Sequence, residues 1–184
     1  MLRIVIIFIV LSFYSPALTS IKEDIISKMQ TINNLSFNFI QTVNNKSENG
    51  KCILAYPKRI YCAYNGANKK IIVSNGKSLV IKTNNNNNYY IYSLNKTPLE
   101  YLLDKEYLIS KIGILEPKDI DDKYINFEII ENNSEINIFF DKKNLNLVGW
   151  QTEDIYQNFS VTFISSVKIN LKINKKIFIL PKNK

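Results

Sequence analysis

Two cysteines are the residues with the clearest chemistry in this sequence. Cys52 and Cys62 lie on either side of Pro57. A hairpin centred on Pro57 places their side chains opposite each other, at a separation that a disulfide can bridge. If the turn contained only Pro57 and Lys58, Cys52 would pair with Ala63 and the two thiols would be one step out of register. We predict the disulfide, with the shifted register as the alternative.

The sequence contains no histidine. This absence excludes histidine-based acid–base catalysis, the Ser-His-Asp and Cys-His nucleophile systems and most zinc sites. Five carboxylates could in principle pair as acid and base, but their polar surroundings favour solvated loops; they are Asp119, Asp121, Asp122, Glu153 and Asp154. No phosphate-binding glycine loop and no EF-hand loop is present. We therefore expect a binding protein without metal or cofactor, the alternative being an enzyme that uses Tyr, Lys or carboxylates.

The first twenty residues have the pattern of a secretory signal peptide. Arg3 is followed by an apolar run, residues 4–13, and then by the helix-breaking sequence Ser15-Pro16-Ala17. The run is too short for the roughly 20 residues of a membrane-spanning helix, which is the alternative interpretation. We expect cleavage between residues 18 and 21, export to the periplasm, and one mature domain spanning residues 21–184. Export also favours the disulfide.

The formal net charge of +8 could indicate nucleic-acid binding. The lysines are, however, spread among asparagines along the chain, and they form neither a basic arm nor an arginine-rich helix. We therefore expect no nucleic-acid partner.

Hydrophobic periodicity predicts an α+β fold. Apolar residues recur at helical spacing in residues 21–32 and 97–112. Short segments rich in Ile, Val, Tyr and Phe, separated by turn-forming residues, predict about ten antiparallel strands; they start at residue 35 and continue at 51–56, 59–64, 69–74, 78–83, 89–93, 125–131, 135–140, 145–152, 158–166 and 176–180. One flat sheet would leave much apolar surface in water. A curved sheet, or an incomplete barrel covered by two or three helices, is therefore expected.

Several of these segments, in this order, resemble the LolA family of periplasmic lipoprotein carriers. The matching features are Phe39-Ile40-Gln41, Gly50, Pro57 followed by residues 60–64, the hairpin at residues 73–80, Thr97-Pro98-Leu99 with Leu102-Leu103, residues 147–150, Asp154, and residues 161–169 and 178–181. The chain departs from the family pattern at two positions. Tyr56 stands where an Arg often helps to hold the covering helices closed, and Cys62 stands where a Trp is usual.

The resemblance implies an incomplete, half-open barrel of eleven strands that carries acyl chains and uses no cofactor. The implied partners are acylated lipoproteins, an inner-membrane lipoprotein-releasing ABC transporter and an outer-membrane lipoprotein acceptor, and we expect a monomer. A lipid- or lipoprotein-binding sensor or regulatory module of the same fold is the alternative.

The family's inward-facing positions give candidates for the cavity wall. From the strands these are Leu54, Tyr56, Ile60, Tyr64, Val80 and Ile81. From the covering helix, which would form a lid, they are Leu99, Leu102 and Leu103. For each of them, ordinary core packing is the alternative, because inward-facing apolar residues have the same pattern in both cases.

Overall fold

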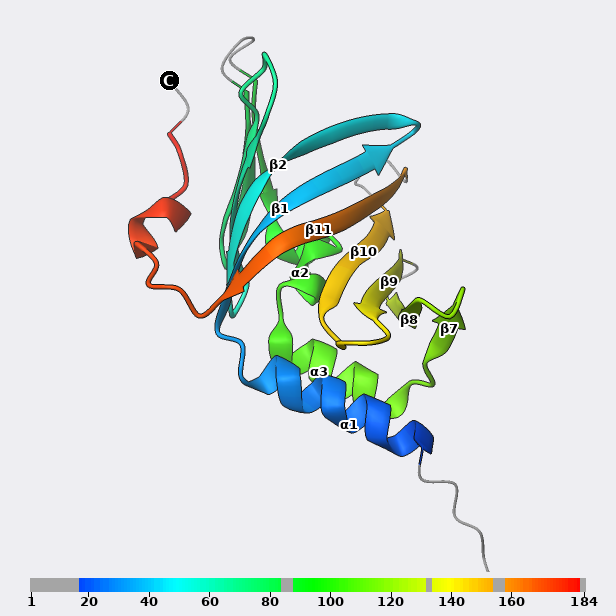
Figure 1. The fold of residues 1–184 in the computed structure, drawn as a ribbon. Helices are drawn as coiled ribbons and strands as arrows, with labels where there is room; N and C mark the ends of the chain where they lie inside the picture. Colours follow the sequence, from blue (N-terminus) through cyan, green and yellow to red (C-terminus); the bar gives the residue numbers. More distant parts are fainter. Residues whose placement is uncertain (1–16, 84–87, 132–133, 154–157, 183–184) are drawn as a thin grey trace, which may run out of the picture.

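The computed structural model describes residues 17–83, 88–131, 134–153 and 158–182 (Figure 1). Within them, eleven strands form one antiparallel sheet in the order β6-β5-β4-β3-β2-β1-β11-β10-β9-β8-β7. The strands are β1 (Asn34–Val43), β2 (Lys46–Ala55), β3 (Arg59–Tyr64), β4 (Ile71–Asn75), β5 (Ser78–Lys82), β6 (Tyr89–Ser93), β7 (Lys118–Ile120), β8 (Tyr124–Glu131), β9 (Ser134–Asp141), β10 (Leu147–Glu153) and β11 (Phe159–Ile169). The α-helices are α1 (Ala17–Gln30), α2 (Leu99–Leu102) and α3 (Lys105–Ile114), and the 3-10 helices are η1 (Leu94–Lys96) and η2 (Lys175–Phe178).

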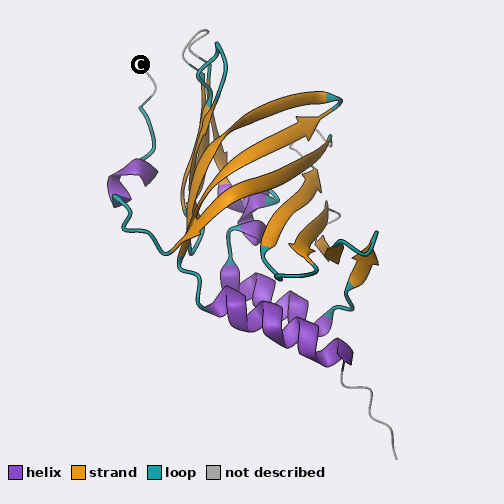
Figure 2. Ribbon diagram, viewed as in Figure 1, coloured by secondary structure: helices purple, strands orange, loops and turns teal. Residues whose placement is uncertain are grey.

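The sheet is strongly curved (Figure 2). It is also open, because its edge strands β6 and β7 do not pair with each other. The chain between these edges forms η1, α2 and α3, which lie on the concave side of the sheet (Figures 1 and 2). Helix α1 packs against α3. The predicted fold class, a curved antiparallel sheet forming a half-open barrel covered by helices, is confirmed.

Tight turns set the register of the strands. In the β4–β5 turn, Gly76 has a φ of +97°, a conformation that glycine adopts without steric cost. The Asn75 side-chain oxygen accepts the backbone N–H groups of Lys77 and Ser78, both at 2.9 Å. This side-chain turn is the reason that an Asn-Gly pair between two apolar segments predicts a hairpin.

The concave side holds two hydrophobic clusters. The first joins α1 and α3 to strands β8 and β9; its most buried members are Ile25, Ile112, Phe127, Ile129, Ile136, Ile138 and Phe140. The second joins β1, β2, β3 and β5 to the lid region; its members include Leu35, Phe37, Phe39, Leu54, Ile60, Leu79, Leu94 and Leu103. Leu147 and Trp150 pack against both clusters.

Strand β2 begins at Lys46, five residues earlier than expected, and three further elements differ from the sequence-based expectations. The helix expected at residues 97–112 is divided in two, because the Asp104 side chain accepts the Tyr107 N–H and so caps a new helix, α3. The strand expected at residues 176–180 is the 3-10 helix η2, which Asn174 caps in the same way. Strand β7 was not expected, since it has only three residues.

Most of the proposed signal peptide, residues 1–20, lies outside the described residues, which begin at Ala17. None of the described helices is both long enough and apolar enough to cross a membrane.

Candidate functional site

A cavity of about 470 Å³ opens between the concave face of the sheet and helix α2. Most of its wall is apolar, supplied by Phe39, Cys52, Ile60, Cys62, Ile72, Leu79, Ile81, Pro98, Leu99 and Trp150. Polar and charged side chains line the rest, together with Val43; they are Gln41, Glu48, Tyr64, Lys70, Tyr90, Tyr92, Thr152, Glu153, Ser160 and Thr162. Its volume lies within the range of about 300–1,000 Å³ that is usual for small-molecule sites.

Strand alternation determines which residues reach this cavity. On β3, Ile60, Cys62 and Tyr64 line it, whereas the residues between them face the opposite side of the sheet. On β5, Leu79 and Ile81 line it for the same reason. The cavity wall is therefore formed by the inward face of strands whose side chains alternate regularly.

Gly50 allows two rings to pack at the wall of the cavity. A Cβ atom at residue 50 would lie 2.9 Å from Cε1 of Phe39 and 2.2 Å from the carbonyl oxygen of Ala63. Without that atom, the Phe39 and Tyr64 rings meet edge to face, with centroids 4.8 Å apart. A side chain at residue 50 would displace this aromatic pair.

The disulfide between Cys52 and Cys62 is confirmed, with an S–S distance of 2.00 Å. Ala55 pairs with Arg59, so the β2–β3 turn contains three residues rather than two. This turn length pairs Cys52 with Cys62 and rules out the alternative pairing with Ala63. The bridge lies in the cavity wall.

A chain of hydrogen bonds runs along the polar part of the wall. The Tyr64 hydroxyl donates to Oε1 of Gln41 at 2.8 Å. Nε2 of Gln41 donates to Oγ of Ser160 at 2.9 Å and to Oγ1 of Thr162 at 3.4 Å. Burial, with a further contribution from Glu48, raises the pKa of Tyr64, so its phenol remains protonated and acts as a donor.

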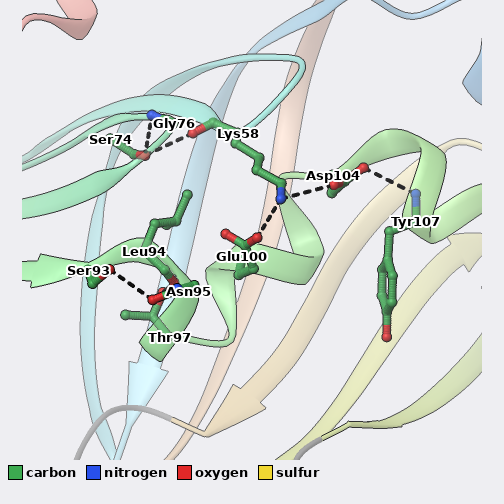
Figure 3. A network of polar contacts seen from close by, with 10 residues as sticks. All are labelled: Lys58, Ser74, Gly76, Ser93, Leu94, Asn95, Thr97, Glu100, Asp104 and Tyr107. Carbon is green, nitrogen blue, oxygen red and sulfur yellow. Dashed lines mark hydrogen bonds and ion pairs between the residues drawn. The ribbon is translucent and has the colours of Figure 1, made fainter.

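Lys58 attaches the lid helix α2 to the β2–β3 turn (Figure 3). Its ammonium group pairs with Glu100 and also lies 3.2 Å from the Asp104 carboxylate. Its backbone N–H donates to the Leu103 carbonyl at 2.7 Å, and its own carbonyl accepts the Ser74 hydroxyl at 2.8 Å. The hydrogen bond to Glu100 is the main reason that the pKa of Lys58 is raised. We call these contacts of Lys58 the latch.

The structure places the candidate cavity residues in several environments. Ile60, Tyr64, Ile81 and Leu99 line the cavity. Leu54 and Leu103 are buried in the second cluster, and Leu102 is buried in the first. Tyr56, at the position where the family pattern often has Arg, borders a separate hollow of about 20 Å³ beside Met29 and Leu108.

Val80 differs from the sequence-based expectation. It follows Leu79 and precedes Ile81, which both line the cavity, so its side chain points to the outer face of the sheet. It is nevertheless fully buried, as is its cross-strand partner Val73. The C-terminal segment covers this side: η2 packs on β3 and β4, Phe178 is buried, and the Arg59 guanidinium lies 5.7 Å from the Phe178 ring centre.

Several site residues were not singled out from the sequence, namely Lys58, Thr152, Ser160 and Thr162, while Gln41 was noted only as part of a motif. For the strand residues there was a signal, since polar residues occupy the inward positions of β10 and β11. Asp119 and Asp122 pair with Lys142 outside the cavity. Asp154 lies outside the described residues, and in the described part no three Cys, Asp or Glu side chains gather to hold a metal ion.

The half-open curved sheet and its cavity give the fold class, and comparison with known families gives the family. The family model described as "Outer membrane lipoprotein carrier protein LolA" matches residues 30–180. The chain therefore belongs to the LolA family. Among curated proteins, the sequence comparison finds no matching relative.

The solved structures that this chain resembles are distant from it in sequence. An uncharacterised conserved protein from Thermus thermophilus is 6% identical, with a TM-score of 0.51 over 88% of this chain and 93% of its own. A putative outer membrane lipoprotein-sorting protein domain from Vibrio parahaemolyticus is 7% identical, with a TM-score of 0.50 over 88% and 95%. A LolA superfamily protein from Nitrosomonas europaea is 12% identical, with a TM-score of 0.44 over 86% and 97%.

Proposed function

We propose that this protein is a periplasmic carrier that holds the acyl chains of lipoproteins in its cavity and takes them from the inner membrane to an outer-membrane acceptor. One observation carries the proposal: a member of the LolA family has an apolar cavity of about 470 Å³ between its curved sheet and helix α2. The protein acts by binding and performs no catalysis.

The physical need for such a carrier is large. Each methylene group left in water costs about 0.8 kcal/mol relative to burial, so a lipoprotein with several long chains leaves a membrane extremely slowly without assistance. A cavity with a mainly apolar wall replaces the contacts that the chains lose when they leave the bilayer.

A carrier must also release its load. The latch supports this requirement, because opening the cavity breaks the contacts of Lys58 with Glu100 and Asp104. The free energy needed for opening is subtracted from the gross binding energy of the chains. Binding is thereby kept weak enough for the load to pass to an acceptor without ATP hydrolysis by the carrier itself.

The proposed partners follow from this role. An inner-membrane ABC transporter releases the lipoprotein, the carrier binds it as a monomer, and an outer-membrane acceptor receives it. The signal peptide proposed at residues 1–20 directs the chain to the periplasm.

The test is release of a lipoprotein from inner-membrane vesicles, together with native mass spectrometry of the protein purified from the periplasm. We expect bound lipoprotein, and we expect Ile81→Asp to reduce its binding while the fold persists, because a carboxylate at the cavity wall can stay hydrated. Ile130→Asp is the matched control, since Ile130 is 69% exposed and lies outside the cavity. Equal binding by the wild type and by Ile81→Asp contradicts the proposal. Binding without transfer to any acceptor favours a sensor of the same fold instead.

A further inference from the structure

Polar side chains occupy part of the cavity wall where apolar ones would suffice to fill a core. Thr152, Ser160 and Thr162 all line the cavity and are 8%, 4% and 3% exposed. A buried hydroxyl group destabilises a protein unless it is hydrogen-bonded. Three of them in the wall of one cavity make this end of the cavity polar.

The direction of the hydrogen bonds shows what these hydroxyl groups can still do. Tyr64 donates to the carbonyl oxygen of Gln41, which leaves the Gln41 amide group to donate to Ser160 and Thr162. Each of these two hydroxyl oxygens is thus engaged as an acceptor, but a hydroxyl group also has one hydrogen to donate. In the described part of the structure, neither Ser160 nor Thr162 donates that hydrogen to another protein atom. Two donors, both nine-tenths buried, are therefore available to a ligand.

The charges around the cavity select against an anionic ligand. The charged side chains in the described lining are Glu48, Lys70 and Glu153, whose formal charges sum to −1. Lys70 is already paired with Glu48, and its ammonium group lies 3.8 Å from the Tyr64 ring centre. A carboxylate or phosphate group at this end would have no free cation to pair with and would be partly desolvated.

We propose that Ser160 and Thr162 bind the carbonyl oxygen of a neutral, ester- or amide-linked acyl group, and that the cavity discriminates against free fatty acids and other anionic head groups. The acyl chain extends from this polar end along the apolar wall formed by Ile60, Leu79 and Leu99. This inference rests on the proposed function, since it concerns the same cavity and names the chemistry of the ligand's head group.

The experiment measures displacement of the fluorescent apolar dye 1-aminoanthracene by two probes that have the same chain, 1-monooleoylglycerol and oleate, at pH 8. We expect the wild type to bind 1-monooleoylglycerol more tightly than oleate. In Ser160→Ala combined with Thr162→Val, affinity for 1-monooleoylglycerol should fall roughly tenfold, because two hydrogen bonds are lost, while affinity for the dye is retained.

Two further variants keep the test decisive. Thr162→Val alone preserves the shape of the side chain and should reduce affinity for 1-monooleoylglycerol about threefold, even if the double variant fails to fold. Thr42→Val combined with Ser165→Ala removes hydroxyl groups from the outer face of β1 and β11 and should change nothing.

The outcomes distinguish this inference from the proposed function. If the wild type binds the dye and both probes equally well, or prefers oleate, the head-group inference is wrong and the carrier proposal stands. The same holds if Thr162→Val binds 1-monooleoylglycerol as tightly as the wild type does. If the wild type binds neither the dye nor either probe, the proposed function itself fails.

Discussion

The two halves of the concave side are built on the same sheet but are filled differently. In the half formed by β8, β9 and β10, which we call the closed half, the side chains of α1 and α3 fill the concavity, and Ile112, Phe127 and Ile136 have no exposed surface. In the half formed by β1 to β6, which we call the open half, only the short helices η1 and α2, of three and four residues, and the residues beside them lie over the sheet. A cavity of about 470 Å³ remains there, and residues of β10 and β11 complete its wall.

The cavity exists because little helix covers the open half. The strands of the two halves do not differ in their pattern of apolar residues. Both halves present inward-facing apolar residues in the same alternating pattern, such as Ile136 and Ile138 on β9 and Leu79 and Ile81 on β5. Protein interiors are close-packed when enough side chains are available. The open half therefore has the composition of a core, with too few side chains above it to complete one.

The largest expected effect comes from Val80→Asp. Val80 is fully buried on the outer face of the open half, the face on which η2 packs against β3 and β4, so an aspartate there would be an unpaired buried charge. We expect a loss of about 3–5 kcal/mol in the free energy of unfolding, enough to unfold a marginally stable domain. Ile81→Asp, one residue further along but facing the cavity, should remain folded. Urea denaturation of the two variants checks this; equal losses would show that the cavity does not exist in solution.

A smaller difference is expected from a matched pair of alanine variants. Ile138→Ala removes methyl and methylene groups from the closed half, where Ile138 is 1% exposed, and should cost about 3 kcal/mol. Ile81→Ala removes the same atoms from the cavity wall, where they already border empty space, and should cost about 1 kcal/mol. Thermal unfolding measures both values. Similar costs at both positions would mean that the open half is as tightly packed as the closed half.

The sequence was sufficient for most of the strands and for proposing the disulfide, because these depend on local patterns. Alternation placed most strands, and Pro57 between two cysteines indicated the hairpin that pairs Cys52 with Cys62. It was not sufficient for the extent of each helix. The division of residues 97–112 into α2 and α3 depends on Asp104 acting as a cap, and the apolar spacing by which the helix was predicted continues across this position.

The cavity residues show a second limit of prediction from the sequence. Val80 and Ile81 were both assigned to the wall, but adjacent residues on a strand face opposite sides, and only Ile81 reaches the cavity. Val80 is buried on the face of the sheet where η2, about a hundred residues later in the chain, packs on β3 and β4, and strand periodicity does not reveal that packing. Lys58 was likewise not recognised, since its partners Glu100 and Asp104 are distant in sequence.

Reduction of the disulfide should destabilise the open half selectively. The bridge closes a short loop between β2 and β3, and loss of such a cross-link costs about 2–3 kcal/mol, or about 5–10 °C in Tm for a domain of this size. Hydrogen exchange should become faster in β2 and β3 than in β8 and β9. The Cys52→Ala/Cys62→Ala variant should behave like the reduced wild type. If protection falls equally in both halves, the two halves unfold as one unit and do not differ in local stability.

The smallest expected effect on stability, and the most informative for binding, is that of Lys58→Met. Lys58 is partly exposed, and ion pairs of this kind contribute at most about 1 kcal/mol to the free energy of unfolding. The variant should therefore be almost as stable as the wild type. The same small free energy has a larger effect on ligand entry, because this ion pair helps to hold α2 over the cavity.

If ligands enter when α2 moves away from the sheet, removing up to about 1 kcal/mol from the closed state raises the open population up to about fivefold. The association rate of 1-aminoanthracene, measured by stopped-flow fluorescence, should rise by a similar factor in Lys58→Met. Lys118→Met is the matched control, because it removes an ion pair that joins β7 to β8, between Lys118 and Glu128. Its association rate should equal that of the wild type. An unchanged rate in Lys58→Met would mean that the latch does not control entry and that ligands reach the cavity without displacing α2.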